Sequence, residues 1–273
     1  MLLIDSHVHI YSCFNLELLL DSALSNFQEV EKTLHSQAGT NSYMLFLAEG
    51  ENQNWYDSMA SELDTHELYR KKITHCWEIS SADREKTSLT CSHVENGAEI
   101  HILPGKQIVT QEGIELLVFF SGKEISGGRS LAATAENAWK KGAMVILPWG
   151  AGKWLGNRGK RVGELITRSP GGGLFLGDNG GRPSLIPDPK LFCIARKRGL
   201  GILRGSDPLP LPYEEKRVGS FGFAIQNFTF IPDHGIATIK TAIASPEYSL
   251  VDFGKLHNSW KFIVKQTRLR IFA

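Results

Sequence analysis

The sequence predicts a mixed α/β protein, and more specifically a barrel built from seven β/α units. Apolar runs of strand length alternate along the chain with stretches of helical spacing. Continuous apolar strands are typical of parallel sheets that helices cover on both faces. The 273 residues are enough for one large domain of this kind with a substantial core. An open, doubly wound sheet is the alternative arrangement of the same elements.

Seven apolar runs are the expected strands, namely residues 2–9, 43–49, 73–79, 114–120, 144–149, 174–179 and 200–207. Five stretches between them are the expected helices, most of them with helical spacing of apolar residues: 16–35, 54–70, 131–141, 162–168 and 189–198. Seven such units near this chain length favour the barrel over the open sheet.

One region interrupts the alternation. Residues 88–94, 99–109 and 114–120 are three consecutive extended segments, and Asn96-Gly97 and Glu112-Gly113 supply turns between them. An inserted β-hairpin region is therefore expected. Beyond about residue 232 the chain is expected to form two helices, the second at 257–271. The sequence thus predicts a single domain over residues 1–273, with a barrel core at about 1–210 and an extension at about 211–273 packed on it.

Composition excludes several classes of function. The formal net charge of +1 gives no reason to expect nucleic acid or an anionic membrane as the main partner. No apolar run reaches transmembrane length, and the N-terminus lacks the pattern of a signal peptide. The four cysteines are scattered and form no C-x-x-C pair, which favours reduced thiols and a cytoplasmic location. The oligomeric state is left open.

The most informative motif is His7-Val8-His9, at the end of the first expected strand. Residues two apart in a strand point to the same side, so both imidazoles leave one face at one strand end. Two nitrogen ligands for a divalent metal are offered in this way. The alternative is a pair of hydrogen-bonded structural histidines.

In a parallel barrel the functional site lies at the C-terminal ends of the strands. Polar or aromatic residues occur there at several independent places, including Glu49, Gln107, Trp149, Asp178, Asn179 and Asp207. This convergence predicts one shared pocket. Asp207 is the expected third metal ligand, since a carboxylate opposite a histidine pair leaves open coordination positions. Its alternative role is to cap or turn the chain before Pro208.

Two glycine-rich loops follow the fifth and sixth expected strands. Lys153 and Arg158 in the first loop, and Arg182 in the second, are the expected contacts to an anionic group. Asp178 and Asn179 are expected to orient the same ligand. Trp149 could stack on it or belong to the core. A small anionic molecule is therefore the expected partner, and the alternative is that these are solvated surface loops.

Four segments together resemble the PHP family (polymerase and histidinol phosphatase), a group of metal-dependent hydrolase barrels. Asp5-Ser6-His7-Val8-His9 resembles the family's D-x-H-x-H motif, and residues 102–107 resemble its P-G-x-E segment. Residues 174–179 are similar to its I-E-V-x-N strand, and residues 195–207 to its final A-x-x-x-G-L…G-S-D segment. The resemblance implies a distorted (β/α)7 TIM-like barrel of the PHP type, with metal bound at the strand ends.

The sequence departs from the family pattern at several metal-ligand positions. Gln107 stands where the family has Glu, Leu117 where it has a His, and Leu209 where it has the last His. Residues 47–50 lack the family's T-D-H, and residues 147–149 lack its A-H-P. The resemblance therefore implies a degenerate site without the usual three metal ions.

Of the family's usual ligands, His7, His9 and Asp207 remain. The resemblance implies one divalent metal at these residues, with Gln107 or Glu49 nearby; two His and one Asp suit zinc, manganese and iron alike. A mononuclear hydrolase of phosphoesters or amide-like substrates is one hypothesis, with Asp207 as ligand or general base. The other is a non-catalytic barrel that binds an anionic ligand or a protein partner. A lyase or isomerase in the same pocket is a third.

Overall fold

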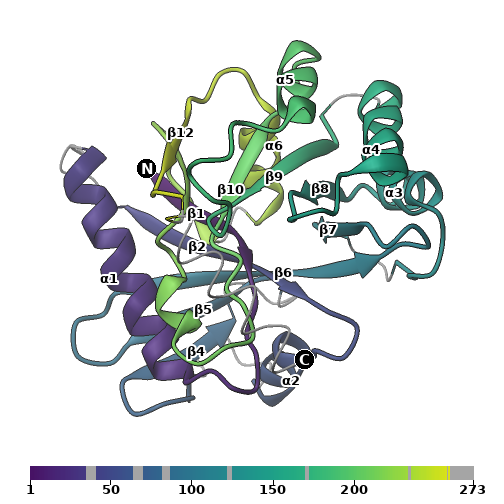
Figure 1. The fold of residues 1–273 in the computed structure, drawn as a ribbon. Helices are drawn as coiled ribbons and strands as arrows, with labels where there is room; N and C mark the ends of the chain where they lie inside the picture. The colour runs from purple at the N-terminus through teal and green to yellow at the C-terminus, as the bar shows by residue number, and fades with distance from the viewer. Residues whose placement is uncertain are drawn as a thin grey trace.

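The computed structural model describes residues 1–34, 41–63, 70–81, 87–121, 125–169, 172–232, 235–256 and 258. A single twisted sheet forms the centre of the molecule and curls into a nearly closed barrel (Figure 1). Along the sheet the strands follow the order β10-β9-β8-β7-β6-β2-β1-β11-β12. Their bounds are β1 Leu2–Val8, β2 Ser42–Glu49, β6 Glu99–Val109, β7 Glu115–Phe119, β8 Met144–Pro148, β9 Leu174–Asn179, β10 Ile202–Gly205, β11 Gly222–Ile225 and β12 Leu250–Phe253. The expected distorted barrel is confirmed.

The barrel closes where the end of β10 meets the end of β1. The Ser6 hydroxyl donates to the Arg204 carbonyl (2.8 Å), and the Asp207 backbone N–H donates to the His7 carbonyl (2.8 Å). The buried Asp5 carboxylate accepts the N–H groups of Ser206 and Gly219, each at 2.8 Å. Burial raises the pKa of Asp5 to about 6, although these hydrogen bonds oppose the shift. These contacts bring the first and last strand ends of the predicted core together.

The barrel is less regular than seven parallel units. The pairs β1–β2, β2–β6, β8–β9 and β9–β10 are parallel, whereas β7 runs antiparallel to both of its neighbours. The prediction that residues 73–79 form the third barrel strand is wrong. Residues 74–76 form a bend, and β4 (Trp77–Ser81) pairs antiparallel with β3 (Lys71–Lys72) and β5 (Leu89–His93). The third barrel strand is β6, because β2 pairs with it directly.

The inserted hairpin region is present as expected. β5 pairs antiparallel with β6, and β6 with β7, through the turns at Asn96-Gly97 and Glu112-Gly113. Gly97 and Gly113 both have φ near +67°, the left-handed conformation that glycine adopts without strain. β6 and β7 belong to the barrel sheet, whereas β5 and β4 lie off its main path, in the lower part of Figure 1.

Helices cover the barrel on opposite flanks (Figure 1). They are α1 Leu16–Leu34, α2 Trp55–Glu62, α3 Leu131–Lys140, α4 Gly156–Arg168, α5 Lys190–Lys197 and α6 Ala237–Ala244. Side-chain caps explain where two of these helices begin. Before α1, Asn15 accepts the Leu18 N–H at 3.1 Å, and before α3, Ser130 accepts the Ala133 N–H at 3.4 Å. None of the described helices has the length and apolar character that a membrane span requires.

Three apolar clusters hold these layers together. One fills the barrel interior, with Leu2, Ile4, Met44, Phe46, Leu103, Leu117, Phe119, Ile146 and Phe223 among its buried members. A second lies between the outer sheet face and α1, α2 and the hairpin. A third lies between the sheet and α3, α4 and α5. The interior is therefore packed, and the polar residues of a site are confined to the strand ends.

The C-terminal part contributes strands that the sequence analysis did not predict. β11 pairs antiparallel with β1, and β12 with β11, so the barrel sheet extends beyond residue 210. The first expected C-terminal helix is present as α6. The second, at residues 257–271, lies outside the described residues except for residue 258. The four cysteines are unpaired in the structure. Their redox state and the cytoplasmic location stay predictions.

Candidate metal centre

A β-bulge at the end of β1 turns His7 and His9 toward the barrel interior. Asp5 is paired with Leu45 and Val8 with Leu47, so three residues of β1 span two of β2. Leu3 and Val8 pack in the outer cluster, whereas Ile4 packs in the interior. Without the bulge, the odd-numbered histidines would face outward together with Leu3. The extra residue places both imidazoles on the inner side of the strand end.

The structure brings His7, His9 and Asp207 together as expected. The Nε2 atoms of the two histidines are 3.0 Å apart, and Asp207 Oδ1 lies 3.5 Å from His7 Nε2 and 3.7 Å from His9 Nε2. Both histidines are buried, and the Asp207 side chain is 25% exposed. The three residues offer their ligand atoms within 4.8 Å of one another. The site is open to solvent on its carboxylate side.

This donor set fits a divalent metal. Two ligand atoms bound to one tetrahedral ion at about 2.0–2.2 Å lie about 3.3–3.6 Å apart, which is close to the separations found here. Burial, reinforced by the neighbouring His7 ring, lowers the pKa of His9 to about 4. His9 is therefore neutral at neutral pH, as a metal ligand must be. The three residues could hold one ion and leave a coordination position open.

Two backbone features position Asp207. Its φ is +47°, a left-handed conformation that Asp adopts more readily than most residues. A Cβ on Gly205 would lie 2.4 Å from His7 N, so only glycine lets the end of β10 approach β1 this closely. β10 ends at Gly205, and the strained turn that follows it directs the Asp207 carboxylate toward the two histidines.

Asn179 links the ligands to one another. Its Nδ2 donates to Asp207 Oδ2 and to the Trp149 carbonyl, both at 2.7 Å. Its Oδ1 lies 3.4 Å from His7 Nδ1. The sequence predicts that Asn179 orients a substrate, and the residue lies at the predicted place, but its described contacts are to the metal-site residues and to the backbone.

Gln107 also lies at the centre, with Oε1 at 3.4 Å from His7 Nε2. The neighbouring strand places Leu117 opposite Gln107, and Leu117 is buried in the apolar interior. The wall beside Gln107 is therefore hydrocarbon and offers no further ligand there. This arrangement agrees with a site for one metal ion.

Two further residues at the site are missing from the sequence prediction. The Tyr11 ring lies 5.2 Å from the His9 ring, and burial together with the charges of Asp207 and Glu115 raises the pKa of Tyr11. Glu115 is the first residue of β7, which the sequence analysis places both among the barrel strands and in the inserted hairpin. Because β7 is antiparallel, its first residue and not its last lies at the end of the barrel that carries the site. The sequence signal for Tyr11 is its place two residues beyond His9.

Glu49 is occupied by structural contacts. Its Oε1 accepts the Tyr56 N–H at 3.0 Å, at the first turn of α2, and its Oε2 accepts from Lys106 Nζ at 2.9 Å. Glu49 pairs with Lys106 across β2 and β6, on the face opposite to the interior residue Ala48. The structure therefore does not bring Glu49 into the ligand cluster.

The first glycine-rich loop brings its lysine to an acidic residue. Lys153 Nζ forms an ion pair with Glu115, and its aliphatic stem lies against Gly150. Arg158 is exposed and donates to the Gly152 carbonyl at 3.0 Å. An anion at this loop would compete with Glu115 for Lys153.

The second loop contains a buried ion pair. Arg182 donates from Nε and Nη2 to the Asp178 carboxylate (2.7 and 3.0 Å) and from Nη2 to Asp188 (3.1 Å). Arg182 Nη1 donates to the Ile186 carbonyl at 3.0 Å. These contacts fold the loop after β9, and Arg182 is 3% exposed. The Trp149 side chain packs against the outer core, so its contact with the centre is through its carbonyl.

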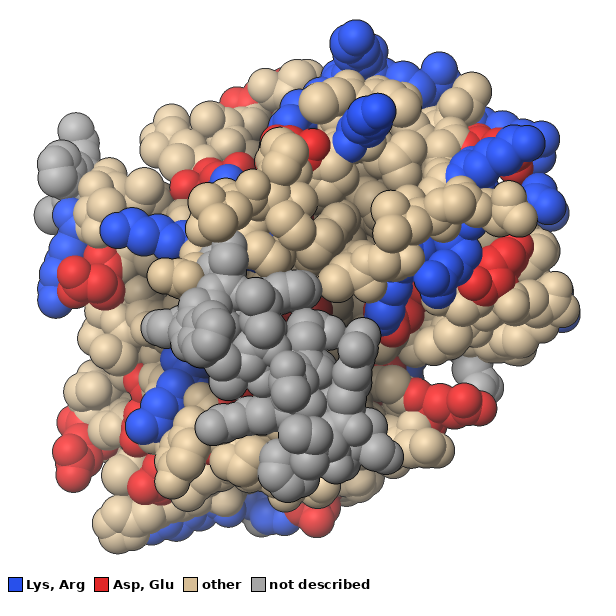
Figure 2. All heavy atoms as spheres, viewed as in Figure 1, with Lys and Arg blue, Asp and Glu red and all other residues tan. Residues whose placement is uncertain are grey.

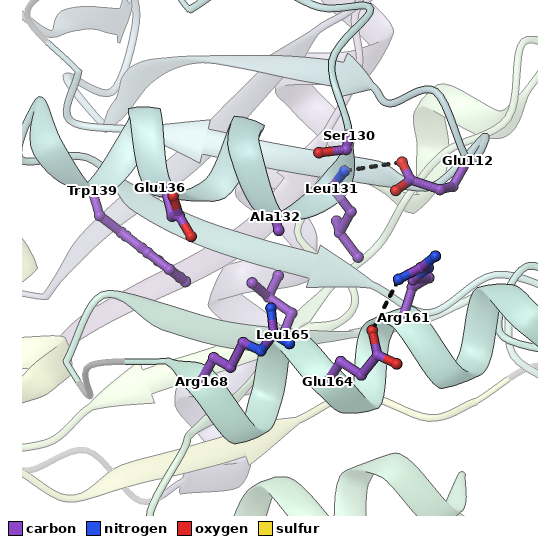
Figure 3. Close-up of a pocket in the computed structure, with 10 residues that line it drawn as sticks. All are labelled: Glu112, Ser130, Leu131, Ala132, Glu136, Trp139, Arg161, Glu164, Leu165 and Arg168. Atoms are coloured by element: carbon purple, nitrogen blue, oxygen red, sulfur yellow. Dashed lines mark hydrogen bonds and ion pairs between the residues drawn. The ribbon is translucent and has the colours of Figure 1, made fainter.

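A separate groove of about 420 Å³ lies between α3 and α4 on the outer surface (Figure 3). Its charged residues are partly engaged: Glu112 accepts the Leu131 N–H at 2.9 Å, and Arg161 pairs with Glu164 at 3.2 Å. None of the predicted site residues lines it. It is distinct from the metal centre.

The fold and the centre together define a distorted barrel with a His/His/Asp cluster at its strand ends. No family model and no curated protein matches the chain in sequence. Among solved structures, PsfC from Pseudomonas syringae PB-5123 aligns at a TM-score of 0.50 and 13% identity, over 98% of this chain and 97% of that one. The lesion-specific endonuclease PfuEndoQ from Pyrococcus furiosus aligns at 0.50 and 14% identity, over 91% of this chain and 57% of that one.

A two-domain protein from Bacteroides vulgatus ATCC 8482, containing a "predicted PHP-like metal-dependent phosphoesterase", aligns at a TM-score of 0.44 and 15% identity, over 92% of this chain and 64% of that one. At these identities the likeness concerns the fold. This chain therefore shares the fold of PsfC and PfuEndoQ.

Proposed function

We propose that the chain is a mononuclear metal-dependent hydrolase acting on a phosphoester or an amide-like substrate. The observation that carries this proposal is the convergence of His7 Nε2, His9 Nε2 and Asp207 Oδ1 at the barrel opening. Three protein ligands with an open side are typical of catalytic rather than structural metal sites. The apolar wall at Leu117 supports one ion rather than several.

A zinc, manganese or iron ion, when bound, supplies Lewis-acid activation of water and of the substrate. The chain supplies orientation and a proton acceptor. Asn179 occupies Asp207 Oδ2, which leaves Oδ1 facing the histidines as the atom able to ligate or to accept a proton from the attacking water. Tyr11 packs beside His9 and limits the access of water from that side.

Lys153 and Arg158 are the proposed contacts to an anionic group of the substrate. Lys153 lies on the loop after β8 and Arg158 in the first turn of α4, at the end of the barrel that carries the cluster, and this placement supports the role. The contacts of Asp178 and Arg182 favour support of the loop over direct binding. A small anionic molecule is the proposed partner in preference to nucleic acid, because described basic and acidic residues are interspersed on the face in Figure 2 and the net charge is +1.

The test is a hydrolysis screen of phosphomonoesters, phosphodiesters and amides with added zinc or manganese. Asp207→Asn keeps the side-chain shape and removes the charge, and we expect it to lower turnover about 100-fold or more. Asp57→Asn, an exposed position on α2, is the matched control and is expected to leave turnover unchanged. Hydrolysis that survives Asp207→Asn at full rate contradicts the assigned role.

A non-catalytic barrel that binds an anionic ligand or a protein is the second candidate. Gln107 and Leu117 favour it, because a neutral amide and a hydrocarbon side chain stand where the resembling family has metal ligands. Metal binding without turnover on any substrate class of the screen would support this candidate over the first.

A further inference from the structure

We infer that Asn179 is a positioning residue of the metal centre, whose amide fixes the ring tautomer of His7 and the orientation of the Asp207 carboxylate. The inference rests on the proposed metal centre but concerns contacts present before any ion binds. Asn179 is 7% exposed, so water does not readily replace its partners.

The orientation of the amide follows from the chemistry of its neighbours. The atom facing Trp149 and Asp207 lies 2.7 Å from a carbonyl oxygen and 2.7 Å from a carboxylate oxygen. Both of these groups act as acceptors, so the amide atom between them must be the donor Nδ2. Its two N–H bonds are thereby used, and Oδ1 must face His7.

The orientation of the amide determines the tautomer of His7. An amide oxygen accepts but does not donate, so the facing His7 Nδ1 is assigned the proton. Gln107 Oε1 lies equally close to His7 Nε2, at 3.4 Å. The contacts described for Gln107 include no acceptor that fixes its amide, so this amide can turn its NH2 group toward Nε2, whereas the Asn179 amide is held by two acceptors. His7 Nε2 then has a free lone pair directed at His9 and Asp207, as a metal ligand requires. The Nδ1–Oδ1 separation of 3.4 Å is long for a hydrogen bond.

The same amide also fixes the orientation of the Asp207 carboxylate. By holding Asp207 Oδ2, Nδ2 leaves Oδ1 directed toward the two imidazoles. One side chain from β9 thus connects β1, the end of β8 and the turn after β10. A substrate contact would require Asn179 to give up one of these bonds, because both donor hydrogens are used.

His9 provides an internal comparison. Its buried Nδ1 has no hydrogen-bond partner in the described part of the chain. The Ala48 backbone and the Gln53 side-chain amide lie near the His9 ring and raise its pKa slightly against the effect of burial, but neither forms a hydrogen bond to Nδ1. Facing ring nitrogens 3.0 Å apart need one donor, so with the His7 proton on Nδ1, His9 Nε2–H is expected to donate to His7 Nε2 in the metal-free protein.

The test uses Asn179→Leu, which keeps the approximate size but removes both functions of the amide. Nitrogen-15 NMR of the metal-free protein at mildly alkaline pH reports which nitrogen of each ring carries the proton. We expect His7 to carry its proton on Nδ1 in the wild type and to lose this preference in the variant. Calorimetry with zinc alone is expected to show affinity about 10- to 100-fold weaker in the variant.

Asn26→Leu is the control. Asn26 Nδ2 also donates to two acceptors, the Lys216 and Val218 carbonyls at 3.1 and 2.8 Å, but from α1. It is expected to change stability without changing the tautomer of His7 or the zinc affinity. The inference is overturned if metal-free wild type holds His7 with the proton on Nε2, or if Asn179→Leu keeps the Nδ1–H tautomer. Failure of the wild type to bind zinc would instead contradict the proposed function, and the tautomer measurement would still decide the role of Asn179.

Discussion

Gly205 lies directly against the backbone of His7: a Cβ at position 205 would be 2.4 Å from His7 N and 2.5 Å from His7 Cβ. Real Cβ contacts essentially never come this close, so the approach depends on glycine. The contact sets where β10 ends relative to β1, two residues before Asp207. The geometry of the metal centre is therefore built into the backbone as well as into the ligand side chains.

Gly205→Ala should damage both stability and metal binding. The added methyl group meets backbone atoms, which have less freedom to move than a side-chain end, so we expect a loss of about 2–3 kcal/mol in unfolding free energy. Zinc affinity should also fall, because β10 must shift away from His7. Urea unfolding and calorimetry measure the two effects. Gly181→Ala is the matched control, since a Cβ at position 181 would have nothing within 4 Å and the φ of Gly181 is not positive; equal effects of both substitutions would contradict the explanation.

Removal of Arg182 should destabilise the loop after β9. Arg182→Met leaves the buried Asp178 carboxylate without its partner, and we expect a loss of about 3–5 kcal/mol in urea unfolding. The double variant Arg182→Met with Asp178→Leu should recover most of the loss, because no uncompensated buried charge remains. Arg196→Met, which breaks the exposed pair with Asp188, should cost at most about 1 kcal/mol. A double variant less stable than Arg182→Met alone would refute this account of the pair.

His101 should make stability depend on pH. Burial lowers its pKa from 6.5 to about 4, and Thr90 Oγ lies 3.0 Å from its Nδ1. As pH falls, the unfolded chain takes up the proton before the folded protein, so the contribution is present above pH 6.5 and lost as pH falls toward about 4. The full change is about 3 kcal/mol.

The measurement is the unfolding free energy of wild type and His101→Gln across this range. The difference between the two proteins removes the contributions of Asp5 and His9, which they share. We expect His101→Gln to become relatively more stable by about 3 kcal/mol from neutral to acid pH. A difference that stays constant with pH would show that the ring does not remain neutral on folding.

The sequence analysis identified the ligands more accurately than the strand that carries them. The spacing of His7 and His9 correctly placed both rings on one face, because residues on either side of Val8 share a side of the chain. It did not predict the bulge after Asp5, since the apolar residues on both sides of the strand satisfy either register. The pairing of β1 with β2 therefore decides whether the histidines point into the barrel or out of it. The sequence of β1 alone does not contain this information.

Strand direction was the main source of error in the rest of the site. Residues 114–120 were expected both among the barrel strands and in the inserted hairpin, and Glu115 was overlooked because site residues were expected only at the C-terminal ends of the strands. Arg182 and Asp178 were expected at an anion because the sequence does not show that they pair with each other. Asn179 was correctly placed at the site, but its role depends on three partners from other strands.

The most direct test of the central claim is the metal content and metal affinity of the purified, untagged protein. Metal analysis without chelator, followed by zinc and manganese titration, should show one ion per chain in the wild type and none in His7→Ala or Asp207→Ala. Circular dichroism should show that both variants remain folded. A wild type that binds no ion, or variants that bind it as tightly as the wild type, would contradict the assignment of His7, His9 and Asp207 as a metal centre.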